Sequence, residues 1–380
     1  MDYYGIHTAL CTPFRGKASA VDHRRLAALV HDHIGFGLHG LVTCGSTGEF
    51  PALSNEERRA VSATVCRAAR GRVPVTVGVG AMSTVEAVGL ARHARKVGAD
   101  AVMLVGPYYE QPSEDELSDY VEAVAGDGGL PVLLYNNPAG TGYSLSTGFI
   151  AKLARIPGVV AIKDTTHQAA RMEELRHLCG NRIQLLGGQD TLQFVGLVAG
   201  ARAAIWGAPN AVPGACVELF ERIAVRGDVA SGRALWDRLY PVNRFLEAEG
   251  YVAAVKAGAD IRGIRLGDPR LPIKPLAAAS RARLAKLMAR LEKARGPRHG
   301  IYRLDRIANL PDYRGRKAAK SCCCGEKRGA RRMIVFIANR LFLMALTMVV
   351  ASFLVFGIME FSPGNVASKT LGPYASEESK

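Results

Sequence analysis

Short apolar runs alternate with amphipathic stretches through the first 295 residues of the chain. A continuous apolar run, bounded by Gly, Pro or charged residues, is typical of a strand that is buried on both faces of a parallel sheet. Such runs begin roughly every 20–35 residues, the spacing expected when a helix separates consecutive strands. Eight strands are predicted in this way, over residues 6–11, 40–44, 73–79, 101–105, 131–135, 159–162, 183–186 and 203–206.

The stretches between these runs carry the signals of helices. Ser54 and Ser113 each precede acidic residues, so a hydroxyl cap followed by negative charge marks two helix starts. The alternation of strand and helix predicts an α/β fold, a (β/α)8 TIM barrel with extra C-terminal helices. An open doubly wound sheet is disfavoured because the Gly-x-Gly-x-x-Gly turn after the first strand is absent. Helices are predicted over residues 22–36, 55–70, 84–97, 114–125 and 168–178, then 216–225, 231–249 and 276–295.

The composition changes at Gly296-Pro297 and divides the chain into three predicted parts. Residues 1–296 form the barrel, residues 297–332 a basic linker expected to be disordered, and residues 333–380 a membrane segment with a short tail. Residues 341–359 carry no charge, and as a helix they would be about 28 Å long, enough to cross a bilayer. Basic residues precede this segment, which predicts a cytoplasmic barrel tethered to the inner face of the cell membrane.

The net charge of +15 would suggest nucleic-acid binding if it were spread over the barrel. Most of the excess lies outside it, since residues 297–340 hold twelve Lys and Arg against three acidic residues. We therefore expect no nucleic-acid partner. The cysteines of the barrel show no Cys-x-x-Cys spacing, so neither a zinc site nor a disulfide framework is indicated.

Lys163 stands at the end of the sixth predicted strand, after four apolar residues. A lysine at this position can extend its side chain to the surface or pair with a carboxylate such as Asp164. Alternatively, partial desolvation keeps its amine neutral often enough to attack a carbonyl group.

Other candidate residues also fall at strand ends, where barrels of this kind place their active sites. Ser46 and Thr47 lie between two glycines after strand two, which suits either a bound carboxylate or phosphate or simply a tight turn. Tyr135 ends strand five, and Tyr109 follows strand four, where a tyrosine either takes part in catalysis or packs. No cluster of His, Asp and Glu falls at these ends, which argues against a metal-dependent enzyme.

Together these residues predict Schiff-base chemistry on a small 2-oxo acid, without a cofactor. Lys163 would attack the keto carbon while Ser46 and Thr47 hold the carboxylate, and a tyrosine would carry protons. The resulting iminium is an electron sink that permits making or breaking of a carbon–carbon bond, or loss of water.

Several motifs resemble those of the dihydrodipicolinate synthase / N-acetylneuraminate lyase family. They are Gly-Ser-Thr-Gly-Glu at 45–49, Tyr-Asn-x-Pro at 135–138 and Ile-Lys-Asp at 162–164, and the resemblance covers roughly residues 4–295. It implies a lysine-dependent aldolase barrel that assembles as a homotetramer. By motif, the resemblance implies that Lys163 is the Schiff-base lysine and that Tyr135 transfers protons. It also implies that Ser46 and Thr47 bind the carboxylate and that Gly188 and Ile205 supply the backbone of the pocket. Tyr109 would reach the site of a neighbouring subunit.

One position departs from the synthase branch of this family. Gly140 stands where the synthases place an arginine that is taken to hold the carboxylate of the second substrate. The missing charged contact is worth about 1.5–3 kcal/mol. The chain is therefore predicted to cleave or dehydrate a 2-oxo sugar acid. The alternative is 4-hydroxy-tetrahydrodipicolinate synthase, which joins pyruvate and aspartate semialdehyde in lysine biosynthesis.

The tail has a weaker resemblance of its own. From Met333 onward it is similar to the N-terminus of a dipeptide/oligopeptide ABC transporter permease. A membrane transport component is therefore another alternative, although one helix cannot form a transport path. A further alternative is a barrel that binds a phosphorylated sugar through Gly187, Gly188 and Gly207.

Overall fold

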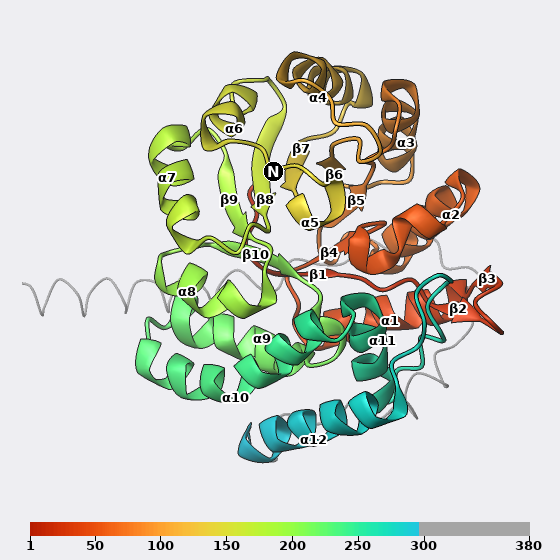
Figure 1. Ribbon diagram of the computed structural model, residues 1–380, viewed down its shortest axis with the longest axis vertical. Helices are drawn as coiled ribbons and strands as arrows, with labels where there is room; N and C mark the ends of the chain where they lie inside the picture. Colours follow the sequence, from red (N-terminus) through yellow and green to blue (C-terminus); the bar gives the residue numbers. More distant parts are fainter. Residues whose placement is uncertain (296–380) are drawn as a thin grey trace, which may run out of the picture. The chain divides into compact units, whose positions relative to one another are not determined.

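The computed structural model describes residues 1–295 of the 380-residue chain, and the predicted barrel is confirmed. Eight parallel strands close on themselves in the order β1-β10-β9-β8-β7-β6-β5-β4 (Figure 1). The predicted strand ends differ from the observed ones by at most two residues. The barrel strands are β1 (Gly5–Ala9), β4 (Gly40–Thr43), β5 (Val75–Gly78), β6 (Ala101–Val105), β7 (Val132–Asn136), β8 (Val159–Asp164), β9 (Gln184–Gly187) and β10 (Ala203–Trp206), and a separate hairpin joins β2 (Phe14–Arg15) to β3 (Ala20–Val21).

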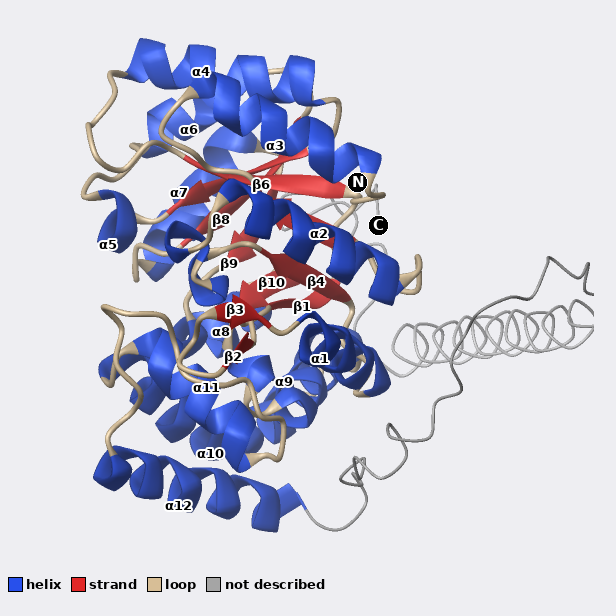
Figure 2. Cartoon of the chain, turned by 90° about the vertical axis from the view of Figure 1, so that its right-hand side faces the viewer, coloured by secondary structure: helices blue, strands red, loops and turns tan. Residues whose placement is uncertain are grey.

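Helices surround the strands, as Figure 2 shows with helices in blue and strands in red. The helices α2 and α4 begin with capping boxes, in which Ser54 with Glu57 and Ser113 with Glu116 satisfy backbone amides. The helices are α1 (His23–Gly35), α2 (Asn55–Ala69), α3 (Thr84–Lys96), α4 (Glu114–Gly128), α5 (Pro138–Thr141), α6 (Thr147–Leu153), α7 (Ala169–Cys179), α8 (Gln193–Val198), α9 (Pro213–Phe220), α10 (Val229–Ala248), α11 (Tyr251–Ile261) and α12 (Ala278–Arg295).

The segment after β10 differs from the prediction. The helix expected over 216–225 is α9, which ends at Phe220 and continues as a π-helical turn over Glu221–Val225. The helix α11 was not predicted at all. Its residues 253–259 are all buried, so it lacks the polar face by which an amphipathic helix is recognised in a sequence. Gly250, at a φ of 75°, separates α11 from α10.

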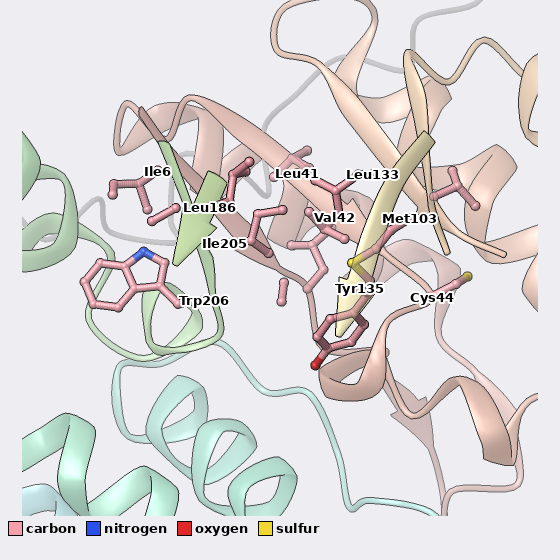
Figure 3. Packing of buried hydrophobic residues seen from close by; sticks show 14 of the residues in the cluster. Ile6, Leu41, Val42, Cys44, Met103, Leu133, Tyr135, Leu186, Ile205 and Trp206 are labelled. Carbon is pink, nitrogen blue, oxygen red and sulfur yellow. The ribbon is translucent and has the colours of Figure 1, made fainter. Parts of the chain in front are cut away.

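Apolar side chains of the barrel strands are buried, as the continuous apolar runs predict, except for the half-buried Val160 and Leu185. Figure 3 shows Leu133, Leu186 and Ile205 in one cluster with Ile6 and Leu41. All five are fully buried, and close packing of this kind fixes the strands relative to one another. The strand ends therefore present their side chains from a rigid support.

Three predictions fall outside the described residues. They are the basic linker over 297–332, the membrane segment at 341–359 and the permease-like tail. Within residues 1–295, no helix is both long enough and apolar enough to cross a membrane.

Candidate active site

Lys163 lies near the carboxyl end of β8, between Tyr135 on β7 and Leu186 on β9 in the strand register. Its side chain does not reach the surface, because the residue is only 6% exposed. The Nζ atom lies 4.4 Å from the centroid of the Tyr135 ring. An amine and a phenol, the two reactive groups of the predicted chemistry, are therefore neighbours at one end of the barrel.

Asp164 is not the partner of Lys163. Its carboxylate accepts hydrogen bonds from Asn136 Nδ2 at 2.8 Å and from Arg171 Nε at 3.2 Å on one oxygen. The other oxygen accepts from the backbone N–H of Thr166 at 3.0 Å. These bonds join the ends of β7 and β8 to the start of α7, and they hold the strand end that carries Lys163.

Ser46 and Thr47 belong to a short 3-10 turn, Ser46–Gly48, directly after β4. Thr47 is buried and Ser46 is half-buried. The next residue, Glu49, has a φ of 58°, in the left-handed region that residues other than glycine rarely adopt. Its carboxylate is 2.5 Å from Lys256 Nζ on α11 and accepts the backbone N–H of Arg270 at 2.8 Å. The turn is thus tightly anchored, and its binding of an anion remains a prediction.

Gly188 follows β9 and donates its backbone N–H to Asp164 O at 3.0 Å. A Cβ atom at this position would lie 2.8 Å from Lys163 Cε and 2.5 Å from Thr165 Cγ2, so only glycine lets the backbone lie against the lysine. Ile205 is fully buried on β10. The structure therefore brings Lys163, Tyr135 and Gly188 together. The Ser46–Gly48 turn follows β4 of the same barrel, and Ile205 lies on β10.

Tyr109 is not brought to this site within one chain. It lies in the loop after β6 and is 88% exposed. The adjacent Tyr108 is 37% exposed and contacts the edge of the Phe50 ring, with centroids 6.1 Å apart. Large exposed aromatic residues often mark contact surfaces, and the expected role of Tyr109 in a neighbouring subunit stays a prediction.

Asp190 and Tyr251 were not predicted as site residues. Burial raises the pKa of the Asp190 carboxyl from its ordinary value to about 7, and the charge of Lys163 acts on it in the opposite direction. Tyr251 donates its hydroxyl to Asp190 Oδ2 at 2.8 Å. Asp190 could have been suspected, because it follows a strand in Gly-Gly-Gln-Asp. Tyr251 gives no sequence signal, because it comes from a helix beyond the eighth strand.

Among residues 1–295, no three His, Cys, Asp or Glu side chains are grouped as a metal site would require. The residues described above supply an amine, phenols, hydroxyls, backbone amides and the Asp190 carboxyl group.

The barrel is similar to proteins of one family throughout its length. A model of the dihydrodipicolinate synthetase family matches residues 2–291. A 4-hydroxy-tetrahydrodipicolinate synthase from Phenylobacterium zucineum is 37% identical over 286 residues, which are 75% of this chain and 96% of that protein. Another, from Sorangium cellulosum, is 39% identical over 292 residues, 77% of this chain and 97% of the relative.

Solved structures give the same picture. The dihydrodipicolinate synthase of Acinetobacter baumannii, complexed with pyruvate, is 33% identical and superposes with a TM-score of 0.73 over 77% of this chain and 99% of that chain. YagE, a prophage protein of this family from E. coli K12 that was also solved in complex with pyruvate, is 31% identical with a TM-score of 0.73 over 76% of this chain and 99% of that chain.

Proposed function

The chain belongs to the dihydrodipicolinate synthetase family and is an enzyme of the lyase class, and from this premise we propose that Lys163 forms a Schiff base with a small 2-oxo acid. The observation that carries the proposal is the position of the amine. Lys163 is buried at a strand end, its Nζ atom faces the Tyr135 ring at 4.4 Å, and the adjacent carboxylate of Asp164 is occupied by Arg171.

In the proposed reaction, the neutral amine of Lys163 attacks the keto carbon. A carbon–nitrogen bond forms, and the carbonyl oxygen leaves as water after it has received two protons, with Tyr135 as the group that carries them. Ser46 and Thr47 hold the carboxylate of the substrate during this step. The cationic iminium then accepts the electron pair of a neighbouring carbon–carbon bond as that bond breaks, which gives an enamine. In a dehydration it accepts instead the pair of a neighbouring carbon–hydrogen bond whose proton is removed, and the enamine then expels hydroxide, which is protonated to water.

We propose a 2-oxo sugar acid as the substrate, and Gly140 on α5 supports this choice. The space that a side chain at position 140 would enter is occupied by the amide of Asn137, whose Nδ2 lies 2.4 Å from a Cβ built there. A neutral amide suits the hydroxyl groups of a sugar chain, whereas a second carboxylate would require a cation.

A second candidate is 4-hydroxy-tetrahydrodipicolinate synthase activity. It is supported by the names of the relatives, which are 35–39% identical and carry this activity. In this case a cation other than one at position 140 must hold the carboxylate of aspartate semialdehyde.

The experiment for Lys163 is reductive trapping. Borohydride with pyruvate should add a stable mass to the peptide that contains Lys163, and the variant Lys163→Arg should show no adduct. Lys152→Arg serves as the matched control, because Lys152 is exposed on α6. An unmodified Lys163 peptide with every 2-oxo acid tested would contradict the proposal. A screen of 2-oxo sugar acids against pyruvate with aspartate semialdehyde then decides between the two substrates.

We propose further that residues 1–296 act as a homotetramer and that Tyr109 completes the site of a neighbouring subunit. Sedimentation of the full chain tests the assembly. Mixing inactive Lys163→Arg subunits with inactive Tyr109→Phe subunits tests the shared site, since hybrids should regain activity if Tyr109 serves a neighbour. Sedimentation as a monomer, or no regain in verified hybrids, would contradict this proposal.

The tail is proposed to be dispensable for the reaction. A chain ending at residue 296 should keep the turnover of the full chain and remain in the supernatant. If residues 341–359 span a membrane, the full chain should sediment with membranes. Loss of turnover on truncation would instead favour the membrane transport alternative.

A further inference from the structure

Three elements that are distant in the sequence meet at one buried polar junction. Tyr251 begins α11, Gly207 follows β10, and Asp190 begins the short turn after β9. Asp190 is 1% exposed, and the Tyr251 side chain reaches it from the helix added beyond the barrel. None of these residues has a role in the reaction proposed above.

The hydrogen bonds of this junction lead from the Gly207 amide, through the Tyr251 hydroxyl, to the Asp190 carboxylate. The Gly207 N–H donates to Tyr251 Oη at 2.9 Å, and Tyr251 Oη donates to Asp190 Oδ2 at 2.8 Å. The same carboxylate oxygen accepts the Ala208 N–H at 3.1 Å. A Cβ atom at Gly207 would lie 2.4 Å from Tyr251 Oη, so the hydroxyl fits directly against the glycine backbone. The Tyr251 hydroxyl therefore links the ends of β9 and β10.

The backbone of Asp190 is also held from outside the barrel. Asn243 Nδ2 on α10 donates to Asp190 O at 2.9 Å. The next residue, Thr191, donates its N–H and its hydroxyl to the Glu247 carboxylate at 3.1 and 2.8 Å. Position and orientation of the Asp190 carboxylate are thus fixed by α10 and α11, and not by the strands alone.

The backbone joins this junction to the proposed Schiff-base lysine, because Gly188, two residues before Asp190, lies against the Lys163 side chain. The positive charge of Lys163 is among the effects that lower the pKa of Asp190. An iminium on Lys163 is cationic, and a fixed carboxylate nearby stabilises such a charge as it forms.

We propose that Tyr251 is a positioning residue of this lyase: its hydroxyl ties Asp190 to the Gly207 amide, so that an ionised Asp190 stands ready to balance the iminium charge on Lys163. The inference rests on the proposed Schiff base. It adds to it a residue outside the barrel strands that controls how readily the iminium forms.

The pH dependence of the iminium follows from the groups that face Asp190. These are Lys163 from β8, Glu247 from α10 and Tyr251 from α11. Burial raises the pKa of Asp190 to about 7, and the hydrogen bond from Tyr251 is the largest effect that lowers it. Removal of the Tyr251 hydroxyl therefore raises the Asp190 pKa further and reduces the ionised fraction at neutral pH.

The test measures the rate of borohydride trapping with pyruvate between pH 5 and 9 in the full chain. The wild type should show a rise in rate with a midpoint near the Asp190 pKa of about 7. In Tyr251→Phe the midpoint should move to higher pH, and the rate at pH 7 should fall about tenfold, as expected for the loss of a hydrogen bond to a charged group. Tyr240→Phe, which alters an exposed tyrosine on α10, should match the wild type.

A slower Tyr251→Phe with an unchanged midpoint would overturn the proposal, because it would show a purely structural role. Should Tyr251→Phe fail to fold, Asp190→Asn decides, since an amide keeps an acceptor for Tyr251 but cannot ionise. Loss of the midpoint in Asp190→Asn supports the proposal, and a midpoint that persists overturns it. Absence of any adduct in the wild type would instead end the Schiff-base function itself, and this inference with it.

Discussion

Two lysines are buried in the barrel, in different surroundings. Lys163 at the end of β8 is 6% exposed, and Lys256 in α11 is 2% exposed. Both amines lie over an aromatic ring, Lys163 Nζ at 4.4 Å from the Tyr135 centroid and Lys256 Nζ at 4.2 Å from the Phe14 centroid. They differ in their ion pairs. Lys256 Nζ lies 2.5 Å from Glu49 Oε1, whereas Asp164, the neighbour of Lys163 in the chain, pairs with Arg171.

The difference separates a structural amine from a candidate nucleophile. Burial and contact with a ring are common to both residues, so neither property identifies the reactive one. A buried ion pair commits both partners to a fixed geometry, and removal of one partner leaves an uncompensated charge. Asp164, the carboxylate next to Lys163, already pairs with Arg171, so the Lys163 amine can turn toward a substrate. Four changes test this contrast.

The largest effect is expected for Lys163→Met. Turnover should fall at least about a thousandfold, because the proposed covalent intermediate cannot form. The free energy of unfolding, from urea titration, should stay within about 1 kcal/mol of the wild type, since a methionine fills the same space. Turnover within tenfold of the wild type would contradict the assignment of Lys163.

Lys256→Met should show the opposite pattern. The change leaves the Glu49 carboxylate buried without its charged partner. It should therefore lower the free energy of unfolding by about 3–5 kcal/mol. The double variant with Glu49→Gln should recover part of that loss, which a double-mutant cycle in urea measures. Equal stability of the single variant and the wild type would show that the pair contributes nothing.

Gly188→Ala tests the surroundings of Lys163 and leaves those of Lys256 unchanged. The added methyl would meet Lys163 Cε and the Asp164 carbonyl oxygen at 2.8 and 2.9 Å, an overpacking that costs about 1–3 kcal/mol. We expect a fall of about tenfold to a hundredfold in kcat/KM if the lysine has to move aside. Gly89→Ala in α3 is the control, because its methyl would meet no atom within 4 Å. Equal kcat/KM in both variants would argue against a tight contact.

The fourth change is Asp190→Asn, measured as stability against pH. The folded pKa of Asp190, about 7, lies above the ordinary value of 3.8. The unfolded chain therefore loses this proton first, and wild-type stability falls as the pH rises from 4 to 7. Asp190→Asn should lack this part of the decline, so its stability relative to the wild type should be higher at pH 8 than at pH 4. Parallel stability curves would contradict the raised pKa.

The barrel strands were predictable because each is a continuous apolar run between turn residues, and the pattern locates such strands closely. Lys163 was found by the same route, as a charge that ends one of these runs. Lys256 was not predicted, because no comparable pattern surrounds it. It lies among small apolar residues in α11, where neither strand nor amphipathic helix is indicated, and its partner Glu49 is more than 200 residues away.

The hydrogen bonds and burial of the Asp190 junction could not be predicted from the sequence. The aspartate follows a strand and is visible as a candidate, but its raised pKa depends on burial by α10 and α11. Such burial is a property of tertiary packing, which no local pattern encodes. Tyr109 shows the same limit, because its expected function depends on a second copy of the chain.

The contacts of Arg270 set the order in which this enzyme can mature during synthesis. Its side chain donates to the carbonyl oxygens of Ala18 and Ala52 and to the Glu57 carboxylate, and its backbone binds Glu49. The turn that holds Ser46 and Thr47 leaves the ribosome early, yet its support arrives more than 200 residues later. A growing chain therefore cannot anchor this turn through Arg270 until almost the whole barrel has been made.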